Sequence, residues 1–297
     1  MANKFKKEAA MSIDLGKSTN QGTALLKLAH QFQPNPLFKD DYLQWFFDES
    51  IVDYWRKNPF DLDTQAKDEE EQLQRIAYWY IALREKHGDE TIEIAIASGC
   101  RQLLLLGSGY DTRFFRLPCI QENSITTFEI DLPKTIENKH NYLVKKLGKI
   151  PPGLSLVPLD FNHDRLSLIA DCGFDNQIPT LYVWQGVSYY LPQDSVSNFL
   201  DFIKSQMIPG SVFVFDCCSP LMTYKNDRIP GIVSHVDKLK EIGEPYQFGM
   251  ASNEMVAWLI DKGFRDIQIC QQDDLEARFL GRRTLPNNMW YVVTAKV

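Results

Sequence analysis

Residues 102–117 read Gln-Leu-Leu-Leu-Leu-Gly-Ser-Gly-Tyr-Asp-Thr-Arg-Phe-Phe-Arg-Leu. The leucine run is short and continuous, which favours a strand buried on both faces. Gly107 and Gly109 end the run and let the backbone turn tightly beside a ligand. Asp111 and Thr112 follow, where a helix could begin. A strand, a glycine turn and a helix start together predict the nucleotide-binding edge of a doubly wound α/β sheet.

A second strand is expected over residues 125–130, which read Ile-Thr-Thr-Phe-Glu-Ile. Glu129 and Asp131 stand near its end, about 20 residues after the glycines, where an acid meets ribose hydroxyls in such folds. A carboxylate suits that place because it can accept a hydrogen bond from each of two neighbouring hydroxyls. A solvated acid at a strand end is the alternative, but the glycine turn favours a ligand site.

The residues after the glycines narrow the choice of nucleotide. A dinucleotide fingerprint would have a third glycine where Thr112 stands. Asp111, in the first helical turn, would repel a pyrophosphate but would tolerate a ligand with a cationic centre. This favours S-adenosylmethionine (SAM) over a nicotinamide cofactor without deciding between them.

Four segments resemble the leucine carboxyl methyltransferase family. Residues 106–117 are similar to its first motif, Leu-Gly-x-Gly-x-Asp-Thr-x-x-x-Arg-Leu. Residues 128–133, Phe-Glu-Ile-Asp-Leu-Pro, resemble the family's Phe/Tyr-Glu-Val-Asp-hydrophobic-Pro. Residues 184–191 resemble Trp-Glu-Gly-x-x-x-Tyr-Leu, and residues 243–249 resemble a late segment of the bacterial branch. The likeness runs from about residue 23 to the C-terminus.

The resemblance implies a Rossmann-like SAM-dependent methyltransferase fold. It has an N-terminal helical cap over residues 1–100 and a SAM-binding core over residues 101–297. The pattern of the core agrees, since five strand–helix units followed by two adjacent strands predict a mostly parallel sheet with a reversed last strand. The remaining strands are expected at residues 154–159, 180–184, 211–215, 264–270 and 290–296.

The cap is expected to consist of helices. They are predicted over residues 23–32, within the aromatic-rich residues 42–55, through residues 78–80 towards Arg84, and over residues 89–97. Residues 61–74 form an acidic stretch that leads into the third of these helices. Outside the cap, residues 222–230 are polar and irregular, a candidate substrate loop.

The resemblance also assigns the methionine end of the cofactor. Arg84 falls where the family has an arginine that grips the SAM carboxylate, a task suited to two parallel N–H groups. A surface arginine is the alternative. Lys27 matches a family lysine, although only with a gap in the alignment. Gly107, Ser108 and Gly109 would present backbone to the methionine part, close to Asp111.

The adenosine end is assigned to acids farther along the chain. Asp131, with Glu129 second, would bind ribose. Asp160 would accept a hydrogen bond from the adenine amine, and Phe161 would cover a ring face. Gln185 stands where the family carries glutamate, so a charge that would favour a cationic ligand is missing. Either SAM binding is weaker, or Gln185 contacts adenine or substrate.

The predicted function is that of a SAM-dependent O-methyltransferase that acts on a carboxylate or hydroxyl of a small molecule or peptide. A carboxylate needs no general base, whereas a hydroxyl needs one. Tyr189, Tyr190, His163 and Tyr224 are candidate bases, and none is assigned as catalytic. The alternatives are an NAD-type oxidoreductase and a non-enzymatic SAM-binding protein, the second motivated by Gln185.

Composition limits the other possibilities. The 297 residues are 44% hydrophobic, as in an ordinary globular chain. The net charge of -7 argues against nucleic acid and anionic membranes as partners. We expect a cytoplasmic protein, because the chain shows neither a signal peptide nor an apolar run of membrane-spanning length. The six cysteines and the histidines lack the spacing of a metal site. Oligomeric state cannot be read from the sequence.

Overall fold

The leucine run forms an interior strand of the sheet. The computed structural model describes residues 18–59, 66–161, 163–164, 167–224, 231–283 and 288–297. In it, β1 (Gln102–Leu106) has all of its residues buried. It pairs in parallel with β2 (Thr126–Asp131) on one side and with β4 (Thr180–Trp184) on the other. The prediction of a strand buried on both faces is confirmed.

Seven strands form one sheet in the order β3-β2-β1-β4-β5-β7-β6. The strands not yet named are β3 (Leu154–Pro158), β5 (Val212–Cys218), β6 (Arg265–Gln271) and β7 (Trp290–Lys296). β7 runs antiparallel to both of its neighbours, so the predicted reversed last strand is confirmed. The chain moves outward from β1 to β3 and then returns to β4. The carboxyl ends of β1 and β4 therefore border the topological switch point, where ligands bind in such sheets.

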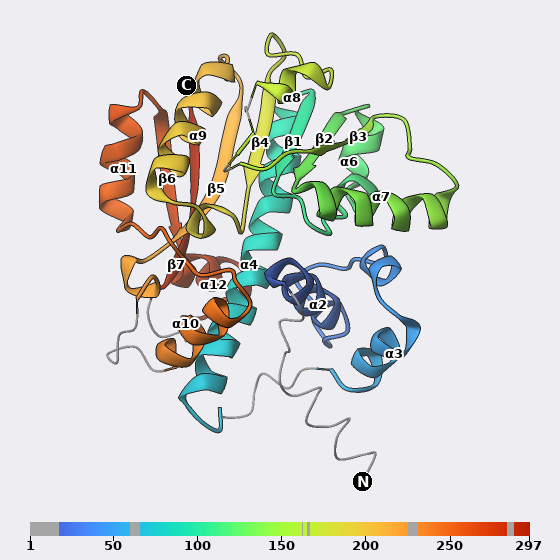
Figure 1. Ribbon diagram of the computed structural model, residues 1–297, viewed down its shortest axis with the longest axis vertical. Coiled ribbons are helices and arrows are strands. Elements are labelled where there is room, and N and C mark those ends of the chain that lie inside the picture. Colours follow the sequence, from blue (N-terminus) through green and yellow to red (C-terminus); the bar gives the residue numbers. More distant parts are fainter. Residues whose placement is uncertain (1–17, 60–65, 162, 165–166, 225–230, 284–287) are drawn as a thin grey trace.

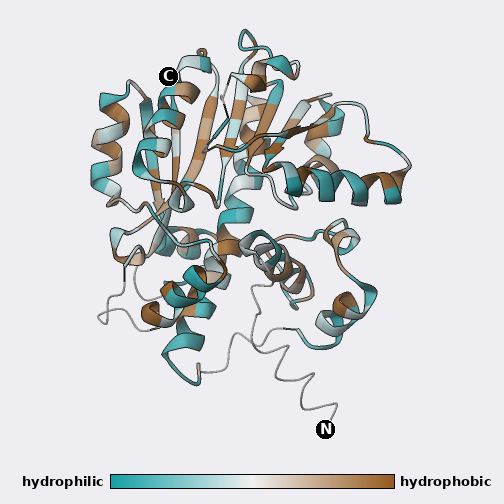
Figure 2. Ribbon diagram, viewed as in Figure 1, coloured by the Kyte–Doolittle hydropathy of each residue, from teal (hydrophilic) through white to brown (hydrophobic). Residues whose placement is uncertain are grey.

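Helices cover both faces of the sheet (Figure 1). Successive residues of β1 point to opposite faces and join separate hydrophobic clusters. Leu103 and Leu105 share a cluster with Ile92 of α4 (Glu69–Ala97). Leu104 and Leu106 share the other cluster with residues of α9 (Gln193–Gln206) and α11 (Ser252–Asp261). Figure 2 shows the strands between these layers as the most hydrophobic part of the molecule.

Further elements connect the strands. They are α5 (Arg113–Arg116), α6 (Pro118–Glu122), α7 (Pro133–Leu147), α8 (Leu168–Asp171), α12 (Gln272–Leu280), η2 (Ser188–Tyr190) and η3 (Pro220–Met222). The helix expected after the glycines is thus only four residues long, and it begins one residue after Thr112.

A group of helices lies beyond the carboxyl ends of the strands, around the first half of α4 (Figure 1). It consists of α2 (Thr19–Gln31), η1 (Leu43–Phe46), α3 (Glu49–Lys57) and α10 (Ile232–Glu241). α2 begins four residues before the predicted start at residue 23. Residues 1–17, 61–65 and 225–230 are outside the described part, so the expectations for them stay open. The division into a cap and a core at residue 100 also stays a prediction.

One helix prediction was wrong. The sequence suggested separate helices before and after Gly88, but α4 is a single helix of 29 residues. A Cβ atom on Gly88 would lie 2.7 Å from Nη2 of Arg113 and 3.0 Å from Oε1 of Gln185. Gly88 therefore does not mark the end of a helix. It lets the side chains of Arg113 and Gln185 pack directly against the backbone of α4.

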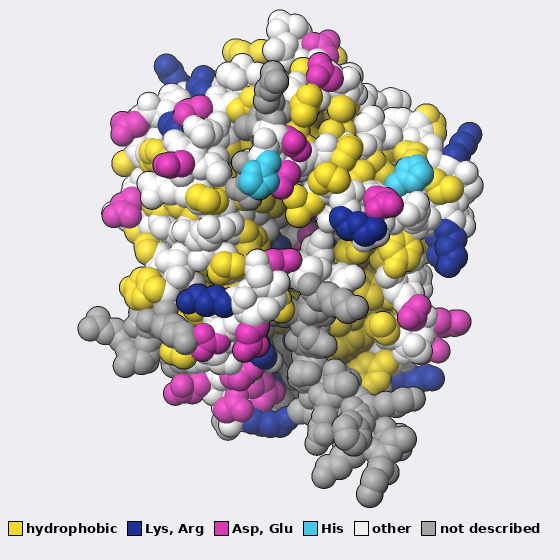
Figure 3. Space-filling view, in the orientation of Figure 1, with side chains coloured by type: hydrophobic (Ala, Val, Ile, Leu, Met, Phe, Trp, Pro, Cys, Tyr) yellow, Lys and Arg dark blue, Asp and Glu magenta, His cyan; other side chains and the backbone are white. Residues whose placement is uncertain are grey.

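Charged side chains are distributed over the surface. Figure 3 shows both signs on the face drawn, with acidic side chains gathered in its lower part, in keeping with the net charge of -7. Among the helices of the described ranges, we find none whose length and apolarity would allow it to cross a bilayer.

Replacing Gly88 with alanine should lower the free energy of unfolding by about 1–3 kcal/mol, because the new methyl group meets the immobilised Arg113 guanidinium. At Glu93, an exposed position of the same helix, alanine should instead be more stable than glycine by roughly 1 kcal/mol. Urea denaturation of Gly88→Ala, and of Glu93→Ala beside Glu93→Gly, measures both effects. A stabilised Gly88→Ala protein would contradict the packing described here.

Candidate functional site

Two adjoining cavities open at the carboxyl ends of the parallel strands. The first has a volume of about 100 Å³ and the second about 340 Å³. The residues that line both are Thr19, Asn20, Gly107, Gly186 and Tyr190. Because these walls are shared, one elongated ligand could extend through both cavities.

Most of the predicted cofactor residues line these cavities. Those at the first cavity are Lys27, Arg84, Gly107, Ser108, Gly109, Asp111 and Gln185. Those at the second are Gly107, Asp131, Asp160 and Phe161. The structure therefore brings together residues that are widely separated in the sequence. Among the predicted cofactor residues, Glu129 lines neither of the two.

The glycine turn, residues 107–109, is shaped for close approach. Gly107 and Gly109 have φ angles of +71° and +48°, in the left-handed region that favours glycine. A Cβ atom on Gly107 would lie 2.2 Å from Cγ2 of Val187. The backbone between the two cavities can therefore be bare only if residue 107 is glycine.

Asp131 is fixed beside this turn. Its Oδ2 accepts a hydrogen bond from the N–H of Gly109 at 2.7 Å, and its Oδ1 accepts one from the N–H of Leu132 at 2.7 Å. Burial raises the pKa of Asp131, and these two hydrogen bonds oppose that effect. The carboxylate is thus oriented by backbone groups at the wall of the second cavity.

Glu129 has a different position from the one expected. It is fully buried and forms an ion pair with Lys139 of α7. The Nζ of Lys139 also donates to the carbonyl oxygen of Asp111 at 2.6 Å. Burial raises the pKa of Glu129 to about 7, against the opposing effect of Lys139. Glu129 therefore lies where it supports the backbone after the glycine turn, and the geometry gives no support to a ribose contact.

Arg84 is buried, so the alternative of a surface arginine is wrong. Its Nη1 donates to Oδ2 of Asp216 at 2.6 Å and to the hydroxyl of Tyr189 at 3.1 Å. Asp216 also accepts a hydrogen bond from the N–H of Gly186 at 2.6 Å. The guanidinium is therefore held rigidly in the wall of the first cavity, beside the loop that follows β4.

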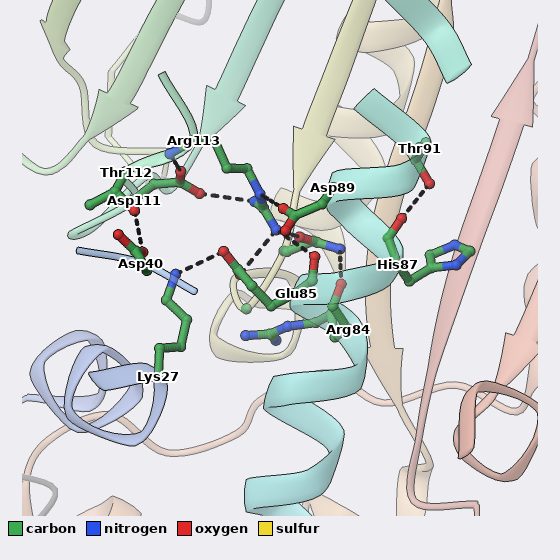
Figure 4. Close-up of polar contacts among 12 residues, drawn as sticks. Lys27, Asp40, Arg84, Glu85, His87, Asp89, Thr91, Asp111, Thr112 and Arg113 are labelled. Atoms are coloured by element: carbon green, nitrogen blue, oxygen red, sulfur yellow. Dashed lines mark hydrogen bonds and ion pairs between the residues drawn. The ribbon is translucent and has the colours of Figure 1, made fainter. Parts of the chain in front are cut away.

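A buried ion cluster joins the glycine-turn region to the helices around it. Figure 4 shows the side chains of Lys27, Glu85, Asp89, Asp111 and Arg113 converging. Arg113 pairs with Glu85 at 3.0 Å, with Asp89 at 2.9 Å and with Asp111 at 2.9 Å. Lys27 of α2 pairs with Glu85 at 3.1 Å.

Arg116 and Asp40 complete the buried ion cluster. Arg116 pairs with Glu85 and with Asp89 at 2.5 Å each, and with Asp40 at 3.4 Å. Burial opposes ionisation of Glu85, but Arg113, Lys27 and Arg116 hold the pKa of Glu85 well below its usual range. Of these residues, Lys27, Asp111 and Arg116 match positions of the family, whereas no local pattern singles out the others.

Gln185 connects the buried ion cluster to the end of β4. Its Oε1 accepts from Nη2 of Arg113 at 3.1 Å, and its Nε2 donates to the carbonyl oxygen of Arg84 at 3.4 Å. The amide thus has partners on both sides. At this position a neutral side chain can satisfy Arg113 without adding another carboxylate to those already around it.

The second cavity is also lined by two segments for which the sequence predicts no role, residues 19–20 and 243–247. The N–H of Thr19, at the start of α2, donates to Oε2 of Glu244 at 2.8 Å. The N–H of Gln247 donates to the carbonyl oxygen of Tyr189 at 2.7 Å. For residues 243–249, the available sequence signal is their resemblance to a late segment of the family. The sequence around Thr19 and Asn20 contains no comparable signal.

Arg113→Met should lower the free energy of unfolding by about 3–5 kcal/mol, because it leaves Glu85, Asp89 and Asp111 buried without their shared partner. Arg283→Met provides the control, since the ion pairs of Arg283 lie at the surface, where solvent screens them, and their loss should change stability far less. Chemical denaturation of both variants is the measurement. Equal losses would show that the buried ion cluster does not stabilise the fold.

The raised pKa of Glu129 predicts a pH effect of defined sign. The folded protein holds this proton more tightly than the unfolded chain, so the stabilisation is complete below about pH 4.5 and is lost as pH rises through about 7. Glu129→Gln cannot titrate here. The free energy of unfolding of the wild type should therefore fall relative to that of Glu129→Gln between pH 5 and about 7.5. A relative rise over this range would mean that Lys139 lowers the pKa of Glu129.

Metal binding has no support in the described ranges, where no three His, Cys, Asp or Glu side chains are grouped so as to hold an ion.

Comparison with solved structures gives the fold. A DUF574 family protein from Streptomyces avermitilis aligns over 91% of this chain and 96% of its own, with a TM-score of 0.60 and 12% identity. A structure titled as a "putative methyltransferase" from Thermobifida fusca aligns over 91% of this chain and 93% of its own, with a TM-score of 0.51 and 14% identity.

Sequence comparison gives the family. A relative from Streptomyces coelicolor, named "Putative S-adenosyl-L-methionine-dependent methyltransferase SCO7813", is 32% identical over 65% of this chain and 66% of its own length. Relatives of the same class from Mycolicibacterium gilvum and Mycobacterium ulcerans are matched over 59% and 51% of their lengths. One from Bacillus subtilis is 27% identical over 88% of this chain and 90% of its own length.

The match to a family model identifies the family more directly than these single relatives do. The model of the leucine carboxyl methyltransferases matches residues 21–204. This range includes the glycine turn, the acids of β2, Asp160 after β3, and Gln185. The chain therefore belongs to the leucine carboxyl methyltransferase family, and the SAM-dependent methyltransferase fold and family that its sequence predicted are confirmed.

Proposed function

We propose that this chain binds SAM across the two cavities and transfers its methyl group to an oxygen of a small molecule or peptide. One observation carries the proposal. Groups from the ends of four neighbouring strands, and from α2 and α4, surround two adjoining cavities. The first has Lys27 and Arg84 in its wall and the second has Asp131 and Asp160. SAM has the complementary arrangement, with a carboxylate at one end and a ribose with adenine at the other.

The residues present fit such a ligand. Arg84 and Lys27 border the first cavity and would hold the methionine carboxylate. Asp131 is oriented towards the second cavity and would accept hydrogen bonds from the ribose diol. Asp160 and Phe161 also line that cavity and would bind adenine. The bare backbone of the glycine turn lies between these two groups of side chains.

The chemistry asks mainly for positioning. SAM supplies an electrophilic methyl group on a good leaving group, and alignment of the acceptor oxygen can contribute roughly 7–11 kcal/mol. Burial raises the pKa of Tyr189, and it raises that of Tyr190 to about 12, so both phenols are neutral near pH 7. His163 and Tyr224 line neither cavity. Of the two acceptor classes, this arrangement favours a carboxylate, which is already ionised.

The two rival functions fare less well. Asp111 lines the first cavity, and although burial opposes it, Arg113 lowers the pKa of Asp111, so the side chain is ionised near pH 7. A carboxylate there disfavours the pyrophosphate of a nicotinamide cofactor. The non-enzymatic alternative depended on Gln185, whose amide has hydrogen-bond partners in the structure without needing the family's glutamate charge.

Asp131→Asn tests the proposed function. The wild type should bind SAM in isothermal titration calorimetry, and the substitution should weaken binding at least tenfold, about 1.4 kcal/mol, because the amide that replaces the carboxyl group has one fewer oxygen to accept hydrogen bonds. Asp201→Asn is the matched control, since Asp201 pairs with Lys262 at the surface, away from both cavities. A folded wild type that binds no SAM, or an Asp131→Asn protein with unchanged affinity, would contradict the proposal.

A further inference from the structure

A third cavity, of about 80 Å³, lies beside the first and has no role in the assignment above. It lies between α2, α4 and α10, and α10 contacts α4 along this region (Figure 1). At one end it shares Thr19, Thr23, Arg84, Tyr189 and Tyr190 with the first cavity. At the other end it shares Leu26, Ala77 and His235 with a fourth cavity of about 60 Å³. A row of adjoining cavities thus leads from the methionine end of the proposed cofactor site to α10.

The walls of the third cavity are largely aromatic. Tyr80 stacks on Trp290 with ring centroids 5.4 Å apart, and Tyr246 lies 4.6 Å from Tyr189 and 5.1 Å from Tyr190. Leu26, Ile81 and Leu239 add aliphatic surface. Flat apolar walls of this kind suit a planar apolar molecule, because aromatic rings gain from stacked and edge-to-face contacts.

His235 supplies a polar group at the α10 end. Its ring lies 5.6 Å from that of Tyr246 and 6.5 Å from that of Trp290. The Nε2 atom is buried and has no hydrogen-bond partner among the described residues. Burial lowers the pKa of His235 to about 4, so the ring is neutral near pH 7. A buried unpaired nitrogen is destabilising, and a polar group on a ligand would supply the missing hydrogen bond.

The end of the third cavity that adjoins the first cavity has no general base among its described residues. It does have a cation, Arg84. Burial raises the pKa of each tyrosine that reaches it, namely Tyr80, Tyr189 and Tyr190. Arg84 is held there by Asp216 and keeps its charge. An acceptor that enters at this end must therefore bring an oxygen that is already ionised.

Resting on the proposed function, we propose that the third cavity binds the methyl acceptor and that this acceptor is a small aromatic carboxylic acid. Its carboxylate lies at the Tyr190 end, and a hydroxyl or amino substituent on its ring lies against Nε2 of His235. A carboxylate oxygen forms a bond to the methyl carbon of SAM as the carbon–sulfur bond breaks. The electron pair of that bond goes to sulfur, so the products are a methyl ester and S-adenosylhomocysteine, and no proton moves.

Ala77→Phe tests the location, because it fills the junction of the third and fourth cavities without lining either cofactor cavity. Ala97→Phe is the matched control at an exposed position of the same helix. Radiolabelled SAM is supplied with benzoate, with 4-hydroxybenzoate, with 4-aminobenzoate, or with a tripeptide. Labelled methyl esters of the acids should form with the wild type and Ala97→Phe. Ala77→Phe should lower kcat/KM at least tenfold and change the Kd of SAM less than threefold.

The outcomes separate this inference from the proposed function. Absence of SAM binding by the wild type contradicts the proposed function itself. If SAM binding is unchanged, any of three results overturns the acceptor assignment while leaving cofactor binding intact. They are methylation of the tripeptide alone, no methylation of any of the acids, and full activity of Ala77→Phe.

His235→Phe tests the orientation even if Ala77→Phe does not fold, because it keeps an aromatic ring and removes the nitrogen. The wild type should prefer the two substituted acids to benzoate in KM, and His235→Phe should abolish that preference with little change for benzoate. Val233→Phe, at an exposed position of α10, is the control and should retain the preference. An unchanged preference in His235→Phe would overturn the assigned orientation.

Discussion

The buried ion cluster around Arg113 is the interaction on which the site depends. Arg113 and Arg116 lie in the short helix after the glycine turn, and they pair with acids of α4 and with Asp40. Lys27 of α2 joins the cluster through Glu85. Charges that are removed from water must remain paired, because one buried partner left alone costs several kcal/mol. The cluster therefore fixes how the N-terminal helices meet the sheet, and with that the shape of the first cavity.

The sheet supplies the other constraint. Reversal of strand order between β1 and β4 leaves a crevice at their carboxyl ends, and the glycine turn and Gln185 each follow one of these strands. Asp131 and Asp160 follow the next strands outward, which places acids along the second cavity. Arg84 and the aromatic residues near it lie on the side of α2 and α10. The acceptor would therefore enter the site from a different direction than the cofactor.

Local patterns were enough to predict the sheet and most of the cavity walls from the sequence. β4 and β7 have the predicted bounds, because apolar runs between turn residues leave few alternatives. α4 was divided wrongly at Gly88, since the reason for that glycine lies in Arg113, 25 residues later in the chain. Ion pairs between residues far apart in the chain, such as Lys27 with Glu85, produce no local pattern in the sequence. The ribose contact of Glu129 was predicted from its distance to the glycines along the sequence. That distance cannot distinguish a strand residue that faces a cavity from one that faces a buried lysine.

The most direct test of this account is a crystal structure of the protein with S-adenosylhomocysteine. The account predicts adenine against Phe161 and Asp160, the ribose hydroxyls on Asp131, and the amino-acid carboxylate near Arg84 and Lys27. The sulfur should face the third cavity. An adenosyl group bound in the first cavity, or anywhere outside the crevice between β1 and β4, would contradict it.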